Sequence, residues 1–498
     1  MTHRSRITRR GALAGGCALL ALAGCRTSPR ARDQTLRPLP ATPVREVDPL
    51  FDDISERAFN FFWDTAEPGT GLIPDRWPKP PFASIAASGF ALNAYAIGVE
   101  RGFITRVEGR DRVLMTLKFL HDAPQGPDPA TTAGHEGFFY HFLNFTTGHR
   151  YGDSEISTVD TALLIAGVLF VGNFFDLDNP EEKEIRTLAD ALYRRVNWPW
   201  AAVYGLDIAM GWSPELGFIR FDWRGYNEAM LVYILGLGSP SYPISPRTWE
   251  AWTSEYDDRW GTLEGQTHLT FGPMFGHQYS AIWIDYRGIY DRFMYLQGFD
   301  YFENSRRAAL AQRAYAIRNP LDWEGYGPNV WGLTASDGPA NVTLPYRGEM
   351  RKFASYAARG VGLTENFDDG TLAPTAVISS LPFAPEIVVP AVKSIYSRYG
   401  RHIYGKYGFV DSFNPSFDYD IPLVHGRRVR GLGWVASDYL GIDQGPIIAM
   451  IENYRSELIW RVMKGDPYLR KGLQRAGFEG GWLNEPPPGH PEATAIGS

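Results

Sequence analysis

The chain has 498 residues, of which 44% are hydrophobic and 21% are charged. This composition is typical of a soluble globular protein with a large core, and it argues against disordered, collagenous and polytopic membrane chains. The formal net charge of -7 argues against binding to nucleic acid phosphate. The 15 Trp, 26 Tyr and 29 Phe exceed what a core of this size needs, so we expect some of them to line a binding surface.

Residues 1–25 have the pattern of a bacterial secretory signal. Four arginines precede an uncharged run over 11–24, and the run leads into Cys25 in the sequence LAGC. Because this ending resembles a lipobox, we expect Cys25 to carry a lipid at the mature N-terminus, with a plain soluble secreted form as the alternative. Arg9 and Arg10 suit either Sec or twin-arginine export. The segment predicts a lipid-anchored protein of the cell envelope, with the membrane and the leaflet left open.

The rest of the chain divides into a tether, one domain and a tail. Residues 26–49 contain five prolines and no aromatic residue, which indicates an extended tether. No linker or charge run interrupts 50–471, which predicts a single domain, and the proline triplet within 472–498 indicates a disordered tail. Both cysteines lie within 1–25, so the domain has no thiol for a disulfide, a zinc site or a nucleophile.

Apolar residues recur at helical spacing along the domain, whereas strand-like alternation is scarce. The expected helices cover 54–62, 85–99, 107–120, 159–175, 185–196, 228–237, 301–317, 385–399 and 446–462. An all-helical domain of this length must curl its helices around a shared core, and a toroid of helical hairpins does this with its loops gathered at each end. We therefore predict an all-α toroid. The long aromatic loops at 197–223 and 321–347 are expected to be functional.

Acidic residues at two predicted helix starts are candidates for catalysis. Asp160 fits the third position of a helix capped by Ser157, which gives it a structural explanation, whereas Glu155 precedes the cap and has none. Glu228 begins another predicted helix, where stabilisation by the helix dipole is the structural alternative. Carboxyl groups walled by aromatic rings lose hydration, which raises their pKa toward the range that a general acid needs.

A further set of residues suits a sugar, because aromatic rings can cover its C–H faces while polar side chains bind its hydroxyls. The set is Trp223, Tyr226, His277, Gln278, Asp285, Arg287, Trp331, Asp369 and Trp434. Structural alternatives exist for several of them: a lone His is commonly structural, Asp285 and Arg287 could form only a salt bridge, and loop acids suit turns. With no second His at metal-ligand spacing, no nucleophile elbow and no phosphate loop, cofactor-free carboxylate chemistry is the most economical enzyme hypothesis.

Eight motifs, met in order along the chain, resemble a bacterial glucoamylase-like family of glycoside hydrolases. They are YNEA at 226–229, LGLGSP at 235–240, HQYS at 277–280, WID at 283–285, GLTASD at 332–337, DGTLAP at 369–374, FVDSFN at 409–414 and GIDQGP at 441–446. That family includes endo-β-1,2-glucanases and is similar to the transglycosylating domain of cyclic β-1,2-glucan synthases. The resemblance implies an (α/α)6 toroid and metal-free, inverting hydrolysis of β-1,2-glucan. It also implies Glu228 as general acid, with Glu155 or Asp160 activating water.

These inferences predict an endo-acting β-1,2-glucan hydrolase that works as a monomer without a cofactor. Three alternatives stay open: an exo-acting enzyme that releases disaccharides, a transglycosylase or hydrolase of a different glucan, and a glycan-binding lipoprotein without turnover. Loops such as 340–364 could close one end of the cleft in an exo-acting enzyme. Inversion requires the two carboxyl groups to lie roughly 6.5–9.5 Å apart, so that water fits between them.

Overall fold

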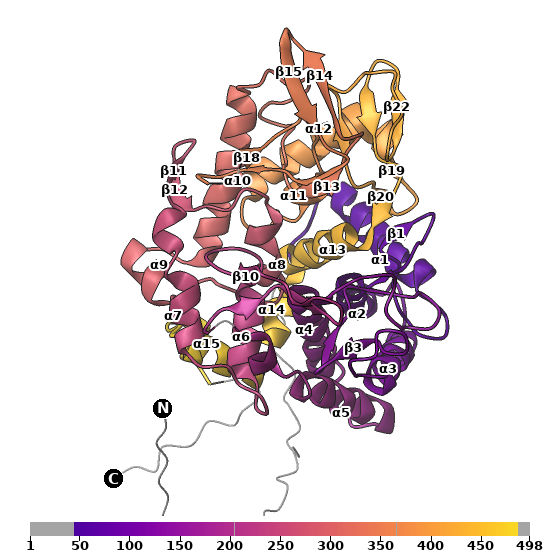
Figure 1. Cartoon of the computed structure of the whole chain (residues 1–498), viewed down its shortest axis with the longest axis vertical. Coiled ribbons are helices and arrows are strands. Elements are labelled where there is room, and N and C mark those ends of the chain that lie inside the picture. Colours follow the sequence, from indigo (N-terminus) through magenta and orange to yellow (C-terminus); the bar gives the residue numbers. More distant parts are fainter. Residues whose placement is uncertain (1–43, 204, 365, 487–498) are drawn as a thin grey trace, which may run out of the picture. The chain divides into compact units, whose positions relative to one another are not determined.

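The computed structural model describes residues 44–203, 205–364 and 366–486. The predicted signal, Cys25 and residues 26–43 of the predicted tether therefore lie outside the described residues. Helices make up most of the regular structure (Figure 1), as the sequence predicts. Within the described part of the chain, no helix is both long enough and apolar enough to cross a membrane.

The long helices match the predicted ones to within a few residues, apart from the last. They are α1 (Pro49–Thr65), α2 (Ile85–Arg101), α3 (Arg106–Asp122), α4 (Thr158–Phe174), α5 (Pro180–Arg194), α6 (Met230–Gly238), α10 (Tyr301–Arg318), α12 (Pro385–Ile403) and α13 (Gly441–Ser456). Shorter helices are α7 (Arg247–Thr253), α8 (Phe275–Trp283), α9 (Arg292–Gln297), α11 (Pro374–Ile378), α14 (Leu458–Met463) and α15 (Pro467–Arg475), with 3-10 turns at Trp198–Ala201, Tyr256–Asp258 and Gly481–Leu483.

Side-chain caps fix several helix starts. The hydroxyl of Ser84 accepts from Ala87 N at 3.2 Å and begins α2, and the hydroxyl of Ser157 accepts from Asp160 N at 3.2 Å and begins α4. Thr105 and Glu108 form a reciprocal capping box at α3. Each cap satisfies backbone N–H groups that the helix itself leaves without a partner. The prediction that Ser157 caps the helix that carries Asp160 is confirmed.

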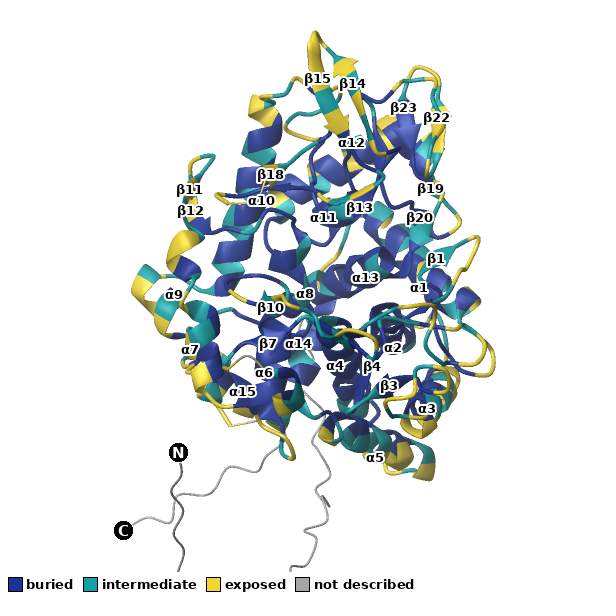
Figure 2. Ribbon diagram, viewed as in Figure 1, coloured by how far each residue is buried: buried dark blue, intermediate teal, exposed yellow. Residues whose placement is uncertain are grey.

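The helices form an inner and an outer layer. α2 and α4 are buried on nearly every face, whereas α5 buries one face and exposes the other, as the dark blue and yellow ribbons of Figure 2 show. α2 packs against both α4 and α13. Glycines allow this close approach, because a Cβ on Gly167 of α4 would lie 2.2 Å from the carbonyl oxygen of Gly89 in α2. The closure of these layers into a toroid stays a prediction.

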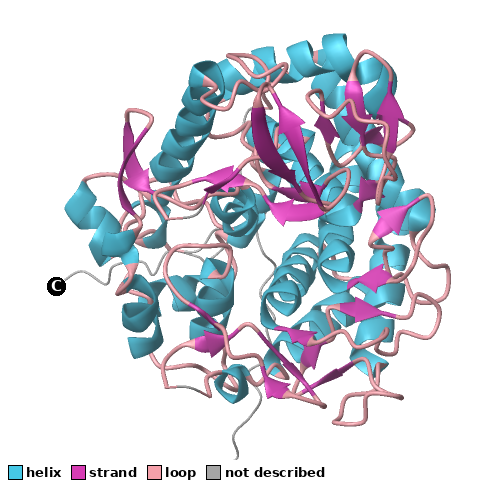
Figure 3. Ribbon diagram, turned by 45° about the horizontal axis from the view of Figure 1, so that its top comes forward, coloured by secondary structure: helices cyan, strands magenta, loops and turns pink. Residues whose placement is uncertain are grey.

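The strands are short, separate pieces among the loops (Figure 3). The two-stranded antiparallel pairs are β1 (Arg76–Trp77) with β24 (Tyr439–Leu440), β2 (Ala83–Ser84) with β5 (Phe142–Leu143), β3 (Gly134–His135) with β4 (Phe138–Phe139), β7 (Ile208–Ala209) with β10 (Asp222–Trp223), β11 (Trp260–Leu263) with β12 (Gln266–Leu269), β13 (Ala335–Asp337) with β16 (Tyr356–Ala358), β14 (Val342–Tyr346) with β15 (Glu349–Phe353), β17 (Gly360–Val361) with β18 (Asn366–Phe367), and β19 (Tyr404–Gly405) with β20 (Gly408–Phe409). Three-stranded sheets join β6 (Ile156–Ser157), β8 (Gly211–Ser213) and β9 (Gly217–Phe218), and β21 (Phe413–Asn414), β23 (Gly433–Val435) and β22 (Arg427–Val429).

The structure changes two predicted boundaries near the C-terminus. The helix expected over 446–462 begins earlier, at Gly441, and breaks at Glu457, whose φ of 56° lies in the left-handed region and separates α13 from α14. The predicted tail begins inside α15, and its first part is folded: Leu473, Phe478 and Leu483 are buried. Arg470 fastens this segment by donating to the carbonyl oxygen of Leu483 at 3.0 Å.

Candidate active site

Three acidic residues lie at the starts of three helices. Asp160 is the third residue of α4 and Asp443 is the third residue of α13. The sequence predicts Glu228 in the first turn of α6, whereas the structure puts it in the preceding turn, because α6 begins at Met230. The N-terminal end of a helix carries partial positive charge, which favours carboxylates.

The hydroxyl of Tyr279, on α8, lies among these acids. Burial and then the negative charges of Asp443, Glu228 and Asp160 raise its pKa well above the ordinary value for tyrosine. Ser280, the next residue of α8, donates through its hydroxyl to the carbonyl oxygen of Glu228 at 3.1 Å. The hydroxyl of Tyr279 donates to the carbonyl oxygen of Ile442, the residue before Asp443, at 3.4 Å. Tyr279 and Ser280 of α8 therefore join the start of α13 to the turn that precedes α6.

His141, which the sequence does not single out, bridges two of the predicted catalytic acids. Its Nδ1 lies 2.9 Å from Oε1 of Glu155, and its Nε2 lies 3.6 Å from Oδ2 of Asp160. The hydroxyl of Ser157 donates to the same Oδ2 of Asp160. About a third of the side-chain surface of both His141 and Glu155 is exposed, whereas Asp160 is 6% exposed. Glu155 thus faces solvent while Asp160 lies beneath it.

The charges of this group are coupled. Burial alone lowers the pKa of His141, but the charges of Asp160 and Glu155 outweigh it and raise the pKa to about 9. Burial in turn raises the pKa of Glu155, but the hydrogen bond and the charge of His141 outweigh it, so the net shift is downward. At neutral pH the group therefore contains an imidazolium ion and an ionised Glu155.

Asp443 also belongs to a second acidic cluster, which contains Asp411 and Asp337. Asp411 and Asp443 are almost fully buried. Burial and the charge of Asp337 raise the pKa of Asp411, and burial and the charge of Asp411 raise that of Asp443. One oxygen of Asp411 accepts from Asp337 N at 2.8 Å and from the hydroxyl of Ser412 at 2.9 Å. Like charges so close cannot both ionise easily, so this pair holds a proton at a pH at which an exposed aspartate has lost it. Both residues lie within motifs that the sequence singles out, but neither is predicted as a site residue.

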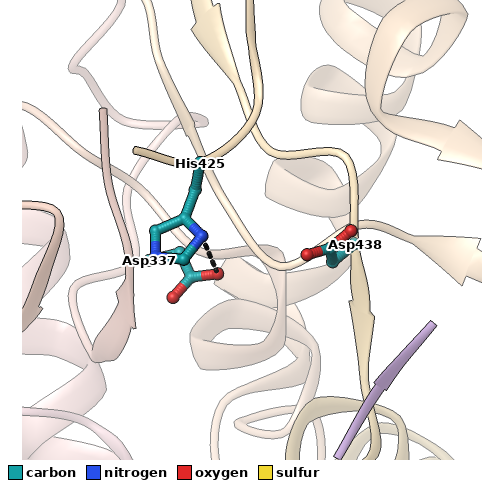
Figure 4. Close-up of side chains that lie close together, drawn as sticks. All are labelled: Asp337, His425 and Asp438. Atoms are coloured by element: carbon teal, nitrogen blue, oxygen red, sulfur yellow. Dashed lines mark ion pairs between the residues drawn. The ribbon is translucent and has the colours of Figure 1, made fainter. Parts of the chain in front are cut away.

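Arg76 supplies a positive charge to this cluster. Its Nη1 donates to Asp337 at 2.8 Å and to Asp438 at 3.4 Å. Figure 4 shows the imidazole of His425 facing Asp337, with the carboxylate of Asp438 to the right of both. These three side chains offer atoms within 4.8 Å of one another, a spacing that suits a metal ion. Because the guanidinium group of Arg76 already binds both carboxylates, we assign them no metal, and the absence of a metal from the mechanism stays a prediction.

Tyr356 presents an aromatic ring beside the second acidic cluster. It pairs with Asp337 across the β13–β16 ladder, and its relative exposure is 62%. The surrounding protein atoms and the charges of Asp411 and Asp337 nevertheless raise its pKa to about 12. No local sequence pattern distinguishes Tyr356 from the other tyrosines of the chain.

The predicted binding residues Trp223, Tyr226 and His277 are mostly buried and hydrogen-bonded. Trp223 donates through Nε1 to the hydroxyl of Thr158 at 2.9 Å and thus ties β10 to the start of α4. His277 Nε2 lies 3.1 Å from the carbonyl oxygen of Phe271, so it must carry the proton, and Nδ1 accepts from the hydroxyl of Tyr226 at 3.1 Å. Burial lowers the pKa of His277 to about 3, which keeps the ring neutral. The structural alternative for this histidine agrees with its contacts.

Four other predicted binding residues, Gln278, Trp331, Asp369 and Trp434, have at most 1% of their surface exposed. Gln278 donates to the carbonyl oxygen of Ala376 at 2.8 Å, and Trp434 donates to that of His425 at 2.7 Å. Asp369 accepts two hydrogen bonds from Arg359 in a fully buried ion pair. With their surfaces covered, these side chains cannot contact a ligand in this structure.

Asp285 and Arg287 lie at the other end of α13. Arg287 donates to Asp285 at 2.7 Å and to Glu457 at 2.8 Å, and Glu457 follows the last residue of α13. Since a helix rises about 1.5 Å per residue, this ion pair lies about 20 Å from Asp443, near the opposite end. The salt-bridge alternative for these two residues agrees with their contacts.

Residues 220–467 match the family model described as "Glycoamylase: Putative glucoamylase". A solved structure of a glucoamylase-like protein from Bacteroides uniformis is 33% identical, covers 88% of this chain and 100% of its own, and superposes with a TM-score of 0.74. The chain belongs to the glycoamylase family. A second solved structure, the endo-β-1,2-glucanase from Chitinophaga pinensis in complex with sophorotriose and glucose, is 31% identical, with coverage of 88% and 100% and a TM-score of 0.74.

A curated relative in sequence is the exo-β-1,2-glucooligosaccharide sophorohydrolase (non-reducing end) from Parabacteroides distasonis. It is 30% identical over an alignment of 462 residues and covers 86% of this chain. The chain spans 57% of the length of that curated relative. Among the acids above, Glu228, Asp411 and Asp443 lie within the range that matches the glycoamylase model, whereas Glu155 and Asp160 precede it.

Proposed function

We propose that this protein hydrolyses β-1,2-glucan or its oligosaccharides. The observations that carry the proposal are two sets of contacts: Tyr279 and Ser280 join the start of α13 to Glu228, and His141 joins the exposed Glu155 to Asp160. Paired carboxyl groups suit the hydrolysis of a glycosidic bond, which needs one acid and one base. The names of two relatives, an endo-β-1,2-glucanase and an exo-acting sophorohydrolase, support the choice of this linkage.

Glu228 is the general acid in this proposal, and Glu155 is the base that activates water. A base must be ionised at the working pH, and the hydrogen bond from His141 keeps the pKa of Glu155 low. Asp160 is the less accessible alternative, since it is buried, accepts a hydrogen bond from Ser157 and forms an ion pair with His141. In an inverting reaction Glu228 would protonate the departing oxygen while water, deprotonated by Glu155, attacks the anomeric carbon from the opposite side. The β-linkage would then yield an α-anomer.

The proposed mode of action is endo, so products of many lengths should appear early in the digestion of a long glucan. The second candidate is exo action with release of sophorose, which the name of the curated relative favours. The β14–β15 hairpin also favours it, because in the chain it lies between β13, which carries Asp337, and β16, which carries Tyr356, and could close one end of the proposed substrate-binding surface. Separation of early products by size distinguishes the two modes, and NMR of the first anomer formed tests inversion.

The experiment that tests the proposed function is a panel of linear glucans with different linkages, incubated with the wild type and with Glu228→Gln. We expect reducing sugar from the β-1,2-linked glucan alone, and its loss in the variant with binding retained. Binding without turnover by the wild type would instead support a glycan-binding protein. Larger glucans appearing among the products would support transglycosylation.

We also propose that the protein is anchored in the cell envelope through Cys25 and acts as a monomer. Exported glucans would then be its substrates. The anchor predicts that the wild type sediments with membranes and that Cys25→Ser is released into the soluble fraction. Equal membrane association of both forms would contradict the anchor without bearing on catalysis.

A further inference from the structure

Three aromatic rings gather at the surface beside the proposed base. The ring centroids of Phe82 and Phe142 lie 4.2 Å apart, and those of Phe82 and Tyr151 lie 4.9 Å apart. Phe82 and Phe142 are half-buried, and Tyr151 is 39% exposed. We name Phe82, Phe142 and Tyr151 the ring cluster. Rings in a hydrophobic core are covered by neighbours, so a cluster that stays partly uncovered has surface available for a ligand.

The ring cluster is continuous with the proposed base. The imidazole of His141 stacks on the ring of Phe142, with centroids 3.9 Å apart and planes 18° apart, and the same imidazole bonds to Glu155 at 2.9 Å. A ligand that covers the rings would therefore extend directly from the point where Glu155 acts.

Backbone pairing holds the ring cluster in place. Phe142 pairs with Ser84 between β5 and β2, and Phe82 immediately precedes β2. Tyr151 N donates to the carbonyl oxygen of Phe142 at 3.0 Å. The three rings are thus attached to the segments that lead into α2 and α4, and their positions are set by the same ladder that positions His141. A prearranged surface binds a flexible chain at a lower entropic cost than a mobile one.

A polar group borders the rings. Arg150, which precedes Tyr151, makes two hydrogen bonds to the carboxylate of Glu215 at 2.6 and 3.0 Å. Half of the Glu215 side chain is exposed, so its oxygens have room to accept from a hydroxyl group. Aromatic faces beside an anchored carboxylate suit a sugar, which has apolar C–H faces and hydroxyl edges.

We propose that the ring cluster is a distal subsite that binds glucosyl units of the β-1,2-glucan beyond those at the cleaved bond. This inference rests on the proposed function and deepens it, because it assigns the ring cluster to the longer part of the substrate. The subsite would make affinity depend on chain length, since only an oligosaccharide that extends from Glu155 to Tyr151 covers the rings. Long chains would gain the ring contacts and be preferred as substrates.

The test measures KM and kcat for β-1,2-gluco-oligosaccharides of increasing, defined length in the wild type, Tyr151→Ala and Phe82→Ala. The variants should raise KM about tenfold for long chains, which corresponds to about 1.4 kcal/mol, and less than twofold for the shortest chain that is cleaved. Tyr151→Phe keeps the ring and should behave as the wild type. Tyr295→Ala is the matched control, because Tyr295 lies on α9 and is 74% exposed.

The outcomes separate this inference from the proposed function. An active wild type whose variants keep the normal KM at every length overturns the subsite and leaves the proposed function intact. A rise in KM that is equal for short and long chains also overturns it, because the rings would then act at the cleaved bond or through folding. A wild type that cleaves no β-1,2-glucan overturns the proposed function, and the subsite with it. Retention of the wild-type melting temperature by Tyr151→Ala excludes a folding defect as the cause of a length-dependent loss.

Discussion

Nδ1 of His141 lies 2.9 Å from Oε1 of Glu155 because the backbones of the two residues are also paired. His141 N donates to the carbonyl oxygen of Glu155 at 2.8 Å. The imidazole is thereby held between Glu155, which precedes α4, and Asp160, which lies in the first turn of α4. This arrangement makes His141 a positioning residue that keeps the proposed base ionised.

Replacement of His141 by Gln should therefore shift the acidic limb of the pH profile. The amide can still donate to Glu155 but has no charge, so the pKa of Glu155 should rise and kcat/KM should fall at low pH. Glu155, Asp160 and Asp75 are the charged groups that act on this histidine. Measurement of kcat/KM from pH 4 to 8 tests the shift. A variant that loses the same fraction of activity at every pH would assign His141 a merely structural role.

The pKa of His141 near 9 also predicts a pH dependence of stability. The folded protein holds this proton more tightly than the unfolded chain, so the stabilisation is complete below the ordinary histidine pKa of about 6.5 and is lost as the pH rises through about 9. The difference in melting temperature between the wild type and His141→Gln should therefore shrink between pH 6 and pH 10. An unchanged difference over this range would contradict stabilisation of the folded protein by a charged His141.

Asp443→Asn should stabilise the protein at alkaline pH relative to the wild type. Burial and the charge of Asp411 raise the pKa of Asp443, and burial and the charge of Asp337 raise that of Asp411, so the folded protein keeps a proton that the unfolded chain releases near pH 4. The free energy of unfolding must then fall as the pH rises above 4, by up to roughly 1.4 kcal/mol per pH unit, until the folded pair ionises. Urea unfolding at pH 5 and pH 8 tests this, with the exposed Asp420→Asn as control. Parallel pH dependences in Asp443→Asn and the wild type would contradict it.

Asp369→Asn should destabilise the protein without weakening the binding of substrate. The change leaves the guanidinium group of Arg359 buried without its charged partner, which costs about 3–5 kcal/mol. Thermal unfolding measures the loss, and KM of the folded fraction should match that of the wild type. A raised KM with a normal melting temperature would instead support the sugar-binding role that the sequence predicts for Asp369.

Gly167→Ala should destabilise the packing of α2 on α4 by about 1–3 kcal/mol, because the new methyl group has no space beside the backbone of Gly89. Chemical denaturation of the wild type and the variant measures this loss. Thr187→Ala is the control, because Thr187 lies on the exposed face of α5. Equal stability of Gly167→Ala and the wild type would mean that the two helices can move apart without cost.

Helical periodicity predicted the long helices because an amphipathic or fully buried helix repeats its apolar residues every three to four positions. The short helix α8 has only nine residues and was not predicted as a helix, although it carries Tyr279. Composition also suggested that the aromatic residues line a cleft, but Trp331 and Trp434 are buried. Sequence patterns do not distinguish a ring in the core from a ring on a binding surface, because both occur beside glycines and acids in irregular loops.

The acids were predictable where they followed a local rule. Asp160 follows a capping serine, and Glu228 lies near the start of an apolar run. His141 and Tyr356 were missed because each acquires its role through a partner distant in sequence: Glu155 for the first and Asp337 for the second. Such pairings depend on strand register, which the sequence of one short strand does not determine.

The most direct test of the central claim, that these carboxyl groups hydrolyse β-1,2-glucan, is the single-turnover rate of Glu228→Gln on a linear β-1,2-glucan. The amide cannot donate a proton to the departing oxygen, so the rate should fall by roughly 10²–10⁴-fold. The dissociation constant for the glucan should stay close to that of the wild type, since the change preserves shape. A variant that binds normally and retains the wild-type rate would contradict the account.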